Sequence, residues 1–543
     1  MAEEEGGTFD ISGYHSIVNS NTVSQRMQFF SCFPSILARR GRAHAVVLLM
    51  PLYLLFAALT ATSVQAQSLP SLGDTEREAL SPLMERKLGE RIMHTIRRDR
   101  DYLDDAPVQE YLSTIGNQLL AAKPDARGEE QYDFFFFVVR DSSLNAFALP
   151  GGFIGVHSGL ILAAQTESEL ASVLAHEIGH VAQRHIARML GKQKQDALIP
   201  LASLILGALA ATASPDAGIA VAMGGQGLAI QRSLDFSRQA EREADRVGLD
   251  ILNKAGFETY GMINFFQRLQ KASRAYSDMA PPYLRSHPLT TERIADIEAR
   301  IRDQRYRQHV DSLDFSLIQA RVRVLQNPSV QGLIDAGDEF KRQLQENTRA
   351  AVITANYGLA LVAFKQGDTG RAQTFLEQAR AALKSSVVSS AATVGDAVIA
   401  NLAIDIKLAA HKSNEAVNEA DQARKRFPLS RGIAHQYAQA LLAAERGQDA
   451  SNYLRDQVQM YRQDQLAYKL LAQAYAVQGK QAQQHMALAE FYVLNGSLPA
   501  ALEQLGIARR SPDASFYDQS IIDAREREIK AQRLEELRQE KEG

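Results

Sequence analysis

The chain has 543 residues, of which 45% are hydrophobic and 23% are charged, and its formal net charge at pH 7 is −3. This composition is typical of a folded protein rather than a disordered one, and the length predicts two or three domains. The nearly balanced charge argues against a nucleic-acid partner, because binding to phosphates requires a surplus of Lys and Arg.

The N-terminal region has the pattern of an export signal. An arginine-rich stretch precedes the apolar run 45–60, and Val64 and Ala66 fit the −3 and −1 positions of a signal-peptidase site. We therefore expect residues 1–66 to be a signal peptide, with translation starting at Met27. The alternative is an uncleaved anchor, because the run approaches the length of about 18 residues at which a helix crosses a membrane.

Three strand patterns precede a helix pattern. The apolar run 134–139, the segment 145–152 with its Pro-Gly-Gly end, and the segment 153–157 each predict a strand. We expect a small antiparallel sheet, followed by a helix that contains the sequence SVLAHEIGHVAQRH at 172–185. Helical periodicity dominates the rest, so the predicted fold is mainly α, with an α+β domain over residues 67–305.

Two histidines and a glutamate in this helix have the spacing of a metal site. His176 and His180 are four residues apart, so both rings point the same way and can bind one zinc ion. Glu177 lies at the edge of the site, where it can act as general base toward water. The alternative is an amphipathic helix that is rich in histidine by accident; composition gives about 0.03 such patterns per chain by chance.

A second helix pattern supplies a candidate third ligand. Glu241 and Asp245, in the sequence EREAD, are also four residues apart and share one helix face. Glu241 would complete the zinc ligands, and Asp245 would accept a hydrogen bond from the ring N–H of a zinc-binding histidine. Taken alone, this stretch reads as a salt-bridged surface helix. With Glu241 as third ligand, we expect His185 to be a surface residue of the helix that contains HEIGH (176–180), the HEIGH helix.

The segment 197–230 is apolar but is interrupted by Pro200 and Gly207. We expect a buried hairpin that covers the domain, since the first apolar stretch is short for a membrane span. The alternative is a mobile apolar cover that makes a peripheral contact with a membrane or a hydrophobic partner.

The sequence beyond about residue 310 is rich in Ala and repeats a helix–turn–helix pattern. Gly367, Gly447 and Gly479 are each expected to close the first helix of a pair, and the spacing of the last two is close to the tetratricopeptide period of about 34 residues. Residues 310–540 are therefore predicted to be an α-solenoid with a concave binding face. The alternative is an irregular helical domain without a groove.

The motif HEIGHVAQRH followed by EREAD resembles zinc metallopeptidase family 48, which includes the CAAX prenyl endopeptidases. The match is specific over about residues 134–299, and the predicted repeats resemble those of Gram-negative periplasmic members. The resemblance implies a gluzincin-like metallopeptidase domain with one Zn²⁺ per chain. It assigns zinc to His176, His180 and Glu241, catalysis to Glu177 and Asp245, a regulatory fourth ligand to His287, and substrate binding to Asn145 and Ala146.

The resemblance also implies a function and a place in the cell. We expect an exported periplasmic zinc endopeptidase that acts on misfolded or misassembled outer-membrane proteins, with repeats that bind these clients or the outer-membrane protein assembly machinery. One alternative is a periplasmic chaperone or adaptor of outer-membrane protein assembly with a latent metal site. Another is a membrane-anchored signalling protease, if the N-terminal apolar run remains uncut. A histidine at position 287 could also assist catalysis rather than restrain it.

Overall fold

The computed structural model describes residues 81–128, 131–191, 238–275, 282–302, 304–384 and 394–542. The predicted signal peptide (1–66) and the predicted apolar hairpin (197–230) lie outside the described residues. Within these ranges, no helix combines the length and apolar character that a membrane crossing requires.

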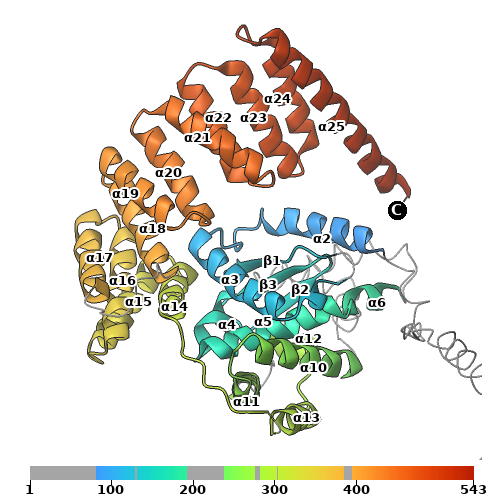
Figure 1. Cartoon of the computed structure of the whole chain (residues 1–543), viewed down its shortest axis with the longest axis vertical. Helices are drawn as coiled ribbons and strands as arrows, with labels where there is room; N and C mark the ends of the chain where they lie inside the picture. Colours follow the sequence, from blue (N-terminus) through green and yellow to red (C-terminus); the bar gives the residue numbers. More distant parts are fainter. Residues whose placement is uncertain are drawn as a thin grey trace, which may run out of the picture. The chain divides into compact units, whose positions relative to one another are not determined.

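The N-terminal half, residues 81–302, is a small sheet with helices packed on both faces (Figure 1). Its elements are α2 (Pro82–Ile96), α3 (Ala106–Ala122), η2 (Pro124–Arg127), β1 (Phe135–Val139), β2 (Ala146–Leu149), β3 (Phe153–His157), α4 (Ser158–Ala163), α5 (Glu167–Ala182), α6 (His185–Gly191), α10 (Arg238–Lys254), α11 (Tyr260–Ala275), α12 (Pro282–Ser286) and α13 (Thr291–Arg302).

The sheet has the strand order β1-β3-β2, with β3 parallel to β1 and antiparallel to β2. The three predicted strands are present, but the prediction of an antiparallel sheet was wrong because β3 pairs with β1 in the parallel direction. Every residue of β3 is buried, as suits a central strand, whereas β2 is only partly buried and lies at an edge. Gly151 and Gly152, with φ of +78° and +89°, make the tight turn between β2 and β3.

Each face of the sheet packs against different helices, because successive side chains of a strand point to opposite faces. Phe137, Leu149 and Phe153 pack with the apolar side chains of α2. Phe136, Val138 and Ile154 belong to the main core, which includes side chains of α3 and α5. Helix α5 is therefore buried between the sheet and α10, where polar side chains are shielded from bulk water.

Two glycines allow α5 and α10 to approach closely. A Cβ on Gly179 would lie 2.9 Å from the carbonyl oxygen of Ala244, and one on Gly248 would lie 3.0 Å from the backbone of Ala175. Helix α5 begins at the N-cap Thr166, whose side chain accepts a hydrogen bond from the Glu169 N–H. The close approach places the HEIGH motif of α5 opposite the EREAD sequence of α10.

The C-terminal half consists of helices that pack mostly against their neighbours in sequence (Figure 1). They are α14 (Leu313–Gln326), α15 (Val330–Leu344), α16 (Arg349–Lys365), α17 (Thr369–Lys384), α18 (Val394–Ala409), α19 (Ser413–Arg426), α20 (Arg431–Ala443), α21 (Gly447–Met460), α22 (Gln465–Val477), α23 (Gln481–Leu494), α24 (Leu498–Arg510) and α25 (Phe516–Glu542).

Two of the three predicted helix-closing glycines lie where expected. Gly367 and Gly479 follow α16 and α22 with positive φ, as a residue after a helix end often does. The prediction for Gly447 was wrong, because Glu445 takes the left-handed conformation (φ +59°) and Gly447 is the first residue of α21. A Cβ on Gly447 would lie 3.3 Å from Val477, so a small residue at this position favours the contact with α22.

One hydrophobic core joins the two halves. The same cluster contains Leu112 and Leu174 of the N-terminal half together with Leu317, Tyr357 and Ile406 of the C-terminal half. Helix α3 contacts α14, α18 and α20. The first helices of the C-terminal half therefore complete the core that supports α5.

A buried ion pair fastens this junction. Arg321 of α14 donates to Asp105, the N-cap of α3, from Nε (2.7 Å) and Nη2 (2.8 Å), and to the Tyr357 hydroxyl from Nη1 (2.9 Å). Replacing Arg321 by Met would leave the Asp105 carboxylate buried without its partner, so we expect a loss of about 3–5 kcal/mol in unfolding free energy. Chemical denaturation measures this loss, and Arg342→Met, at an exposed pair on α15, is the matched control. Equal stability of the two variants would contradict the prediction.

Candidate metal centre

Four side chains from three segments converge in the core. His176 and His180 come from α5, Glu241 from the first turn of α10, and His287 from the turn between α12 and α13. One ligand atom from each lies within 4.8 Å of the others, and all four residues are buried. His176 Nε2 lies 3.0 Å from His180 Nε2 and 3.4 Å from His287 Nδ1. Glu241 Oε1 lies 3.4 Å from His180 Nε2 and 3.1 Å from His287 Nδ1.

These donors fit a zinc ion. Zinc in proteins is usually tetrahedral, with Zn–N bonds of about 2.0–2.1 Å, so its ligand atoms lie about 3.3 Å apart. The separations of 3.0–3.4 Å between the ring nitrogens and the Glu241 oxygen are close to this value, and imidazole and carboxylate are both ordinary zinc ligands. The residues present are therefore able to hold zinc without a thiol ligand.

Asp245 and Arg293 contact the metal-ligand candidates without being ligands themselves. His176 Nδ1 lies 3.0 Å from Asp245 Oδ1, on the side of the ring away from the cluster. Arg293 donates to both oxygens of Asp245 (2.7 and 2.8 Å), and its Nη1 lies 2.8 Å from Glu241 Oε2. Burial lowers the pKa of His176, but the carboxylates of Asp245 and Glu241 outweigh this effect and raise the pKa to about 9. Asp245 therefore lies within contact distance of a histidine of the motif, although His176 Nδ1 makes no hydrogen bond of normal geometry among the described residues.

Glu177 lies beside the cluster without joining it. Neither oxygen of this buried carboxylate has a hydrogen-bond partner of normal geometry among the described residues. His287 Nε2 lies 3.6 Å from Glu177 Oε1. Burial is the main cause that raises the pKa of Glu177. A carboxylate that is poorly solvated and has a raised pKa is suited to accept a proton from a reacting water.

The residues predicted to bind substrate lie at the start of the edge strand. Ala146 is the first residue of β2 and pairs with Val156 of β3, while Asn145 precedes the strand. Asn145 Nδ2 lies 3.4 Å from His157 Nε2, and the Asn145 carbonyl accepts from the His157 N–H at 2.9 Å. Helix α5 contacts β2, so the strand is next to the HEIGH helix.

The prediction that His185 is a surface residue of the HEIGH helix was wrong. Helix α5 ends at Ala182, Arg184 takes a left-handed conformation (φ +50°), and His185 begins α6. The His185 side chain is only 3% exposed, and its Nδ1 lies 2.9 Å from Nδ1 of His180. A break after Ala182 is not visible in the periodicity, which continues through the motif.

Two other neighbours of the site were not identified from the sequence. Tyr283 of α12 is buried and stacks on His287, with ring centroids 4.6 Å apart and an interplanar angle of 27°. Arg293 lies six residues after His287 and also donates to the Pro288 carbonyl at 2.9 Å. In the sequence, Arg293 is recognisable only as a basic residue in the predicted helix after His287. Such residues are too common for this pattern to identify Arg293 as part of the site.

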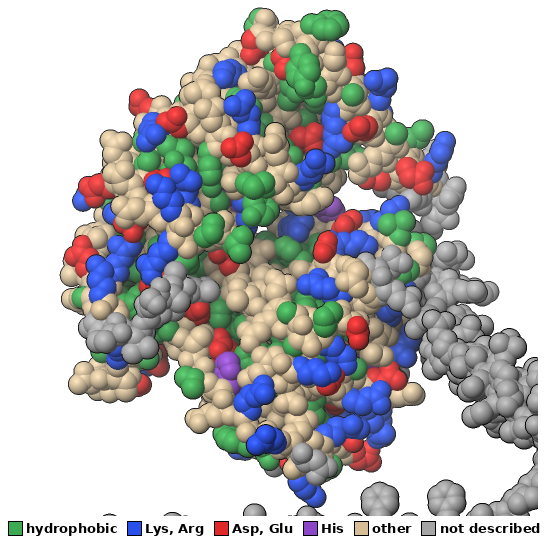
Figure 2. All heavy atoms as spheres, in the orientation of Figure 1, with side chains coloured by type: hydrophobic (Ala, Val, Ile, Leu, Met, Phe, Trp, Pro, Cys, Tyr) green, Lys and Arg blue, Asp and Glu red, His purple; other side chains and the backbone are tan. Residues whose placement is uncertain are grey.

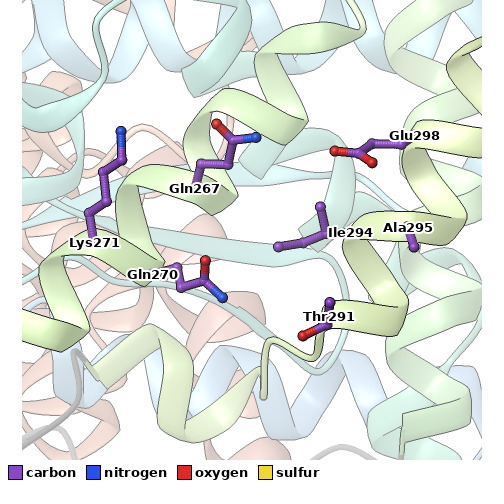
Figure 3. Close-up of a pocket in the computed structure, with 7 residues that line it drawn as sticks. All are labelled: Gln267, Gln270, Lys271, Thr291, Ile294, Ala295 and Glu298. Atoms are coloured by element: carbon purple, nitrogen blue, oxygen red, sulfur yellow. The ribbon is translucent and has the colours of Figure 1, made fainter.

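A cavity of about 370 Å³ lies between α11 and α13 (Figure 3). Its lining includes Gln267, Lys271 and Glu298, but none of the four converging side chains. The metal-binding cluster is instead enclosed by protein, so this cavity is separate from it.

Comparison with known proteins identifies the class. The family model described as "Peptidase family M48" matches residues 107–301, a range that contains the whole cluster. The chain is therefore a zinc-dependent metalloendopeptidase. It is 32% identical to the "Beta-barrel assembly-enhancing protease" of Escherichia coli over an alignment of 461 residues. This alignment covers 85% of this chain and 91% of that protein. The chain is 30% identical over 462 residues to the protein of the same name in Yersinia pestis (84% and 90%).

A mitochondrial metalloendopeptidase of Schizosaccharomyces pombe is 30% identical over 192 residues, which covers 35% of this chain and 52% of that protein. The likeness to the bacterial relatives extends through both halves, whereas this one is confined to a shorter segment. The chain belongs to peptidase family M48. The predicted family, the predicted enzyme class and the mainly α fold with a small sheet are thereby confirmed.

Proposed function

We propose that this chain is a periplasmic endopeptidase that cleaves misfolded or misassembled outer-membrane proteins. The proposed peptidase activity is supported above all by the convergence of His176, His180 and Glu241 beside the buried carboxylate of Glu177. The envelope role is supported by the bacterial relatives, whose name refers to β-barrel assembly and which match 85% of the chain. Family membership favours this function over that of a chaperone or adaptor with a latent metal site.

The roles of the residues follow from their positions. His176, His180 and Glu241 would hold zinc, which supplies Lewis-acid polarisation of the scissile carbonyl and makes water more acidic. Glu177 would accept the proton of the attacking water on a carboxylate oxygen and then pass it to the nitrogen of the leaving amine. Asp245 would keep the ring of His176 in its ligating orientation. The edge strand at Asn145 and Ala146 would align an extended substrate through backbone hydrogen bonds.

His287 would keep the enzyme closed. A catalytic zinc needs an open position in addition to three protein ligands, and the His287 ring is close enough to the other ligands to take that position. Its Nε2 also faces Glu177. The stacking of Tyr283 and the bond from Arg293 to the Pro288 carbonyl favour this closed arrangement. Displacement of the loop by a substrate or partner would then free both the fourth position and the base.

The C-terminal half, with its predicted tetratricopeptide repeats, would bind clients or the assembly machinery. Several of its large apolar side chains are exposed, among them Leu429, Met460, Val477 and Phe516. Acidic and basic side chains are interspersed over this half on the face in Figure 2, which suits a polypeptide better than a polyphosphate. The segment 197–230 would add a peripheral membrane contact.

Replacing Glu241 by Ala tests the proposed function. Loss of a residue that hydrogen-bonds to a metal ligand typically lowers metal affinity by about 10–100-fold. The Glu241→Ala variant loses a ligand itself, so its zinc affinity should fall by more than this. It should also fail to cleave an unfolded outer-membrane β-barrel protein. Elemental analysis and gel assays measure the two effects, with Asp250→Ala, a half-exposed position on the same helix, as control. Retention of zinc by Glu241→Ala, or equal loss in the control, would contradict the assignment.

A further inference from the structure

A chain of hydrogen-bonding side chains runs from the metal centre to the surface of α10. His180 Nδ1 lies 2.9 Å from His185 Nδ1, and His185 Nε2 lies 3.1 Å from Glu243 Oε2. Arg188 donates from Nη2 to the same oxygen of Glu243 at 2.7 Å. His180 and His185 are buried, while the Glu243 side chain is 22% exposed.

The directions of these bonds are determined by ligation at His180. Its Nε2 faces the cluster, 3.0 Å from His176 Nε2, so a metal bound there leaves the ring proton on Nδ1. That N–H must donate to Nδ1 of His185, which therefore carries its own proton on Nε2. The His185 Nε2–H in turn donates to Glu243. Every donor in the chain then meets an acceptor, and no ring needs a second proton.

The two histidines of the motif thus have different partners. His176 is backed by a buried carboxylate, Asp245, which Arg293 neutralises. His180 contacts the neutral imidazole of His185 instead of a carboxylate. The site therefore does not bury a further negative charge beside His180 and Glu241. The negative charge of Glu243 lies on the far side of His185 from His180, where solvent and Arg188 stabilise it.

The turn that brings His185 under His180 is anchored from another element. Arg184, at the positive-φ position, donates from Nε to Glu85 of α2 at 2.8 Å, and Tyr132 donates to the other Glu85 oxygen at 3.1 Å. Ala187 of α6 packs in the same hydrophobic cluster as Leu88 and Ile92 of α2. The turn that leads to His185 is therefore anchored by contacts that do not involve the metal ligands.

We propose that His185 is a positioning residue for the zinc ligand His180, acting through its Nδ1 and held in the required tautomer by Glu243. The proposal rests on the proposed function, because it presupposes that His180 binds zinc through Nε2. Partners that orient a ligating histidine usually contribute about 10–100-fold to metal affinity.

The test compares variants of the full chain that also carry Glu177→Gln, which prevents self-cleavage. His185→Leu supplies an apolar side chain of similar size that has no acceptor, and it should weaken zinc binding by about 10–100-fold in competition with a chelator. His185→Asn places an amide oxygen near the position of Nδ1 and should lose clearly less affinity. Co²⁺ bound in place of zinc should show an altered visible spectrum in His185→Leu and not in His185→Asn.

A double-mutant cycle separates positioning from general support of the fold. Glu243→Leu should weaken zinc binding in the same direction, and the variant with both His185→Leu and Glu243→Leu should bind zinc no more weakly than His185→Leu alone. Additive losses, or a parental zinc affinity in His185→Leu, would overturn the proposal. If His185→Leu does not fold, equal zinc affinities of Glu243→Leu and the parent overturn it instead. Failure of the parent itself to bind zinc would contradict the proposed function.

Discussion

Glu177→Gln is expected to lower kcat/KM for peptide-bond hydrolysis by about 10²–10⁴-fold, which is the usual contribution of a general base. Gln keeps the length and the helical preference of Glu but cannot accept the proton of the attacking water. Zinc content should not change, because Glu177 faces the His287 ring and is not one of the four converging donors.

The same substitution should not destabilise the fold. The carboxylate of Glu177 is fully buried and burial raises its pKa, so replacing it by a neutral amide removes a charge that is costly to bury. Thermal unfolding and zinc analysis check these points, and Glu90→Gln, at a half-exposed position on α2, serves as the control. Cleavage of an unfolded protein by Glu177→Gln at the parental rate would refute the catalytic assignment.

His287→Ala is expected to raise basal proteolysis. The ring lies among the other three ligands, so its removal opens the fourth position while His176, His180 and Glu241 remain. If the closed form holds about nine-tenths of the molecules, the rate should rise about tenfold, because the competent fraction increases from one-tenth to nearly all. Self-cleavage of the purified variant is the simplest sign of this change.

The direction of the change in activity distinguishes the two roles of His287. A histidine that stabilises the developing oxyanion would make His287→Ala less active rather than more active. Zinc content should stay near one per chain in either case. Glu292→Ala, an exposed position in the first turn of α13, is the control for general effects on this loop. A rate lower than that of the parent would show that His287 assists catalysis.

The parts of the site that could be predicted from the sequence are local in the chain. His176 and His180, and likewise Glu241 and Asp245, are four residues apart, so helical geometry alone places each pair on one face. The family pattern then relates the two helices, and the close packing at Gly179 and Gly248 explains how they meet.

The parts that were missed depend on contacts between distant segments. The insertion of β3 between β1 and β2 follows from burial over the whole sheet, not from the strand patterns. The contact between His185 and His180 depends on the break at Arg184, because a helix continued through Arg184 would carry His185 away from His180. The junction at Arg321 and Asp105 joins residues that are far apart in the chain, and neither residue lies in a recognisable motif.

The most direct measurement is the position of the anomalous-scattering peak at the zinc absorption edge in crystals of the full chain carrying Glu177→Gln. We expect one peak per chain, within bonding distance of His176 Nε2, His180 Nε2 and Glu241, at about 2.0–2.2 Å. A peak elsewhere, or no peak in protein purified with zinc, would contradict the claim that these residues form the catalytic metal centre.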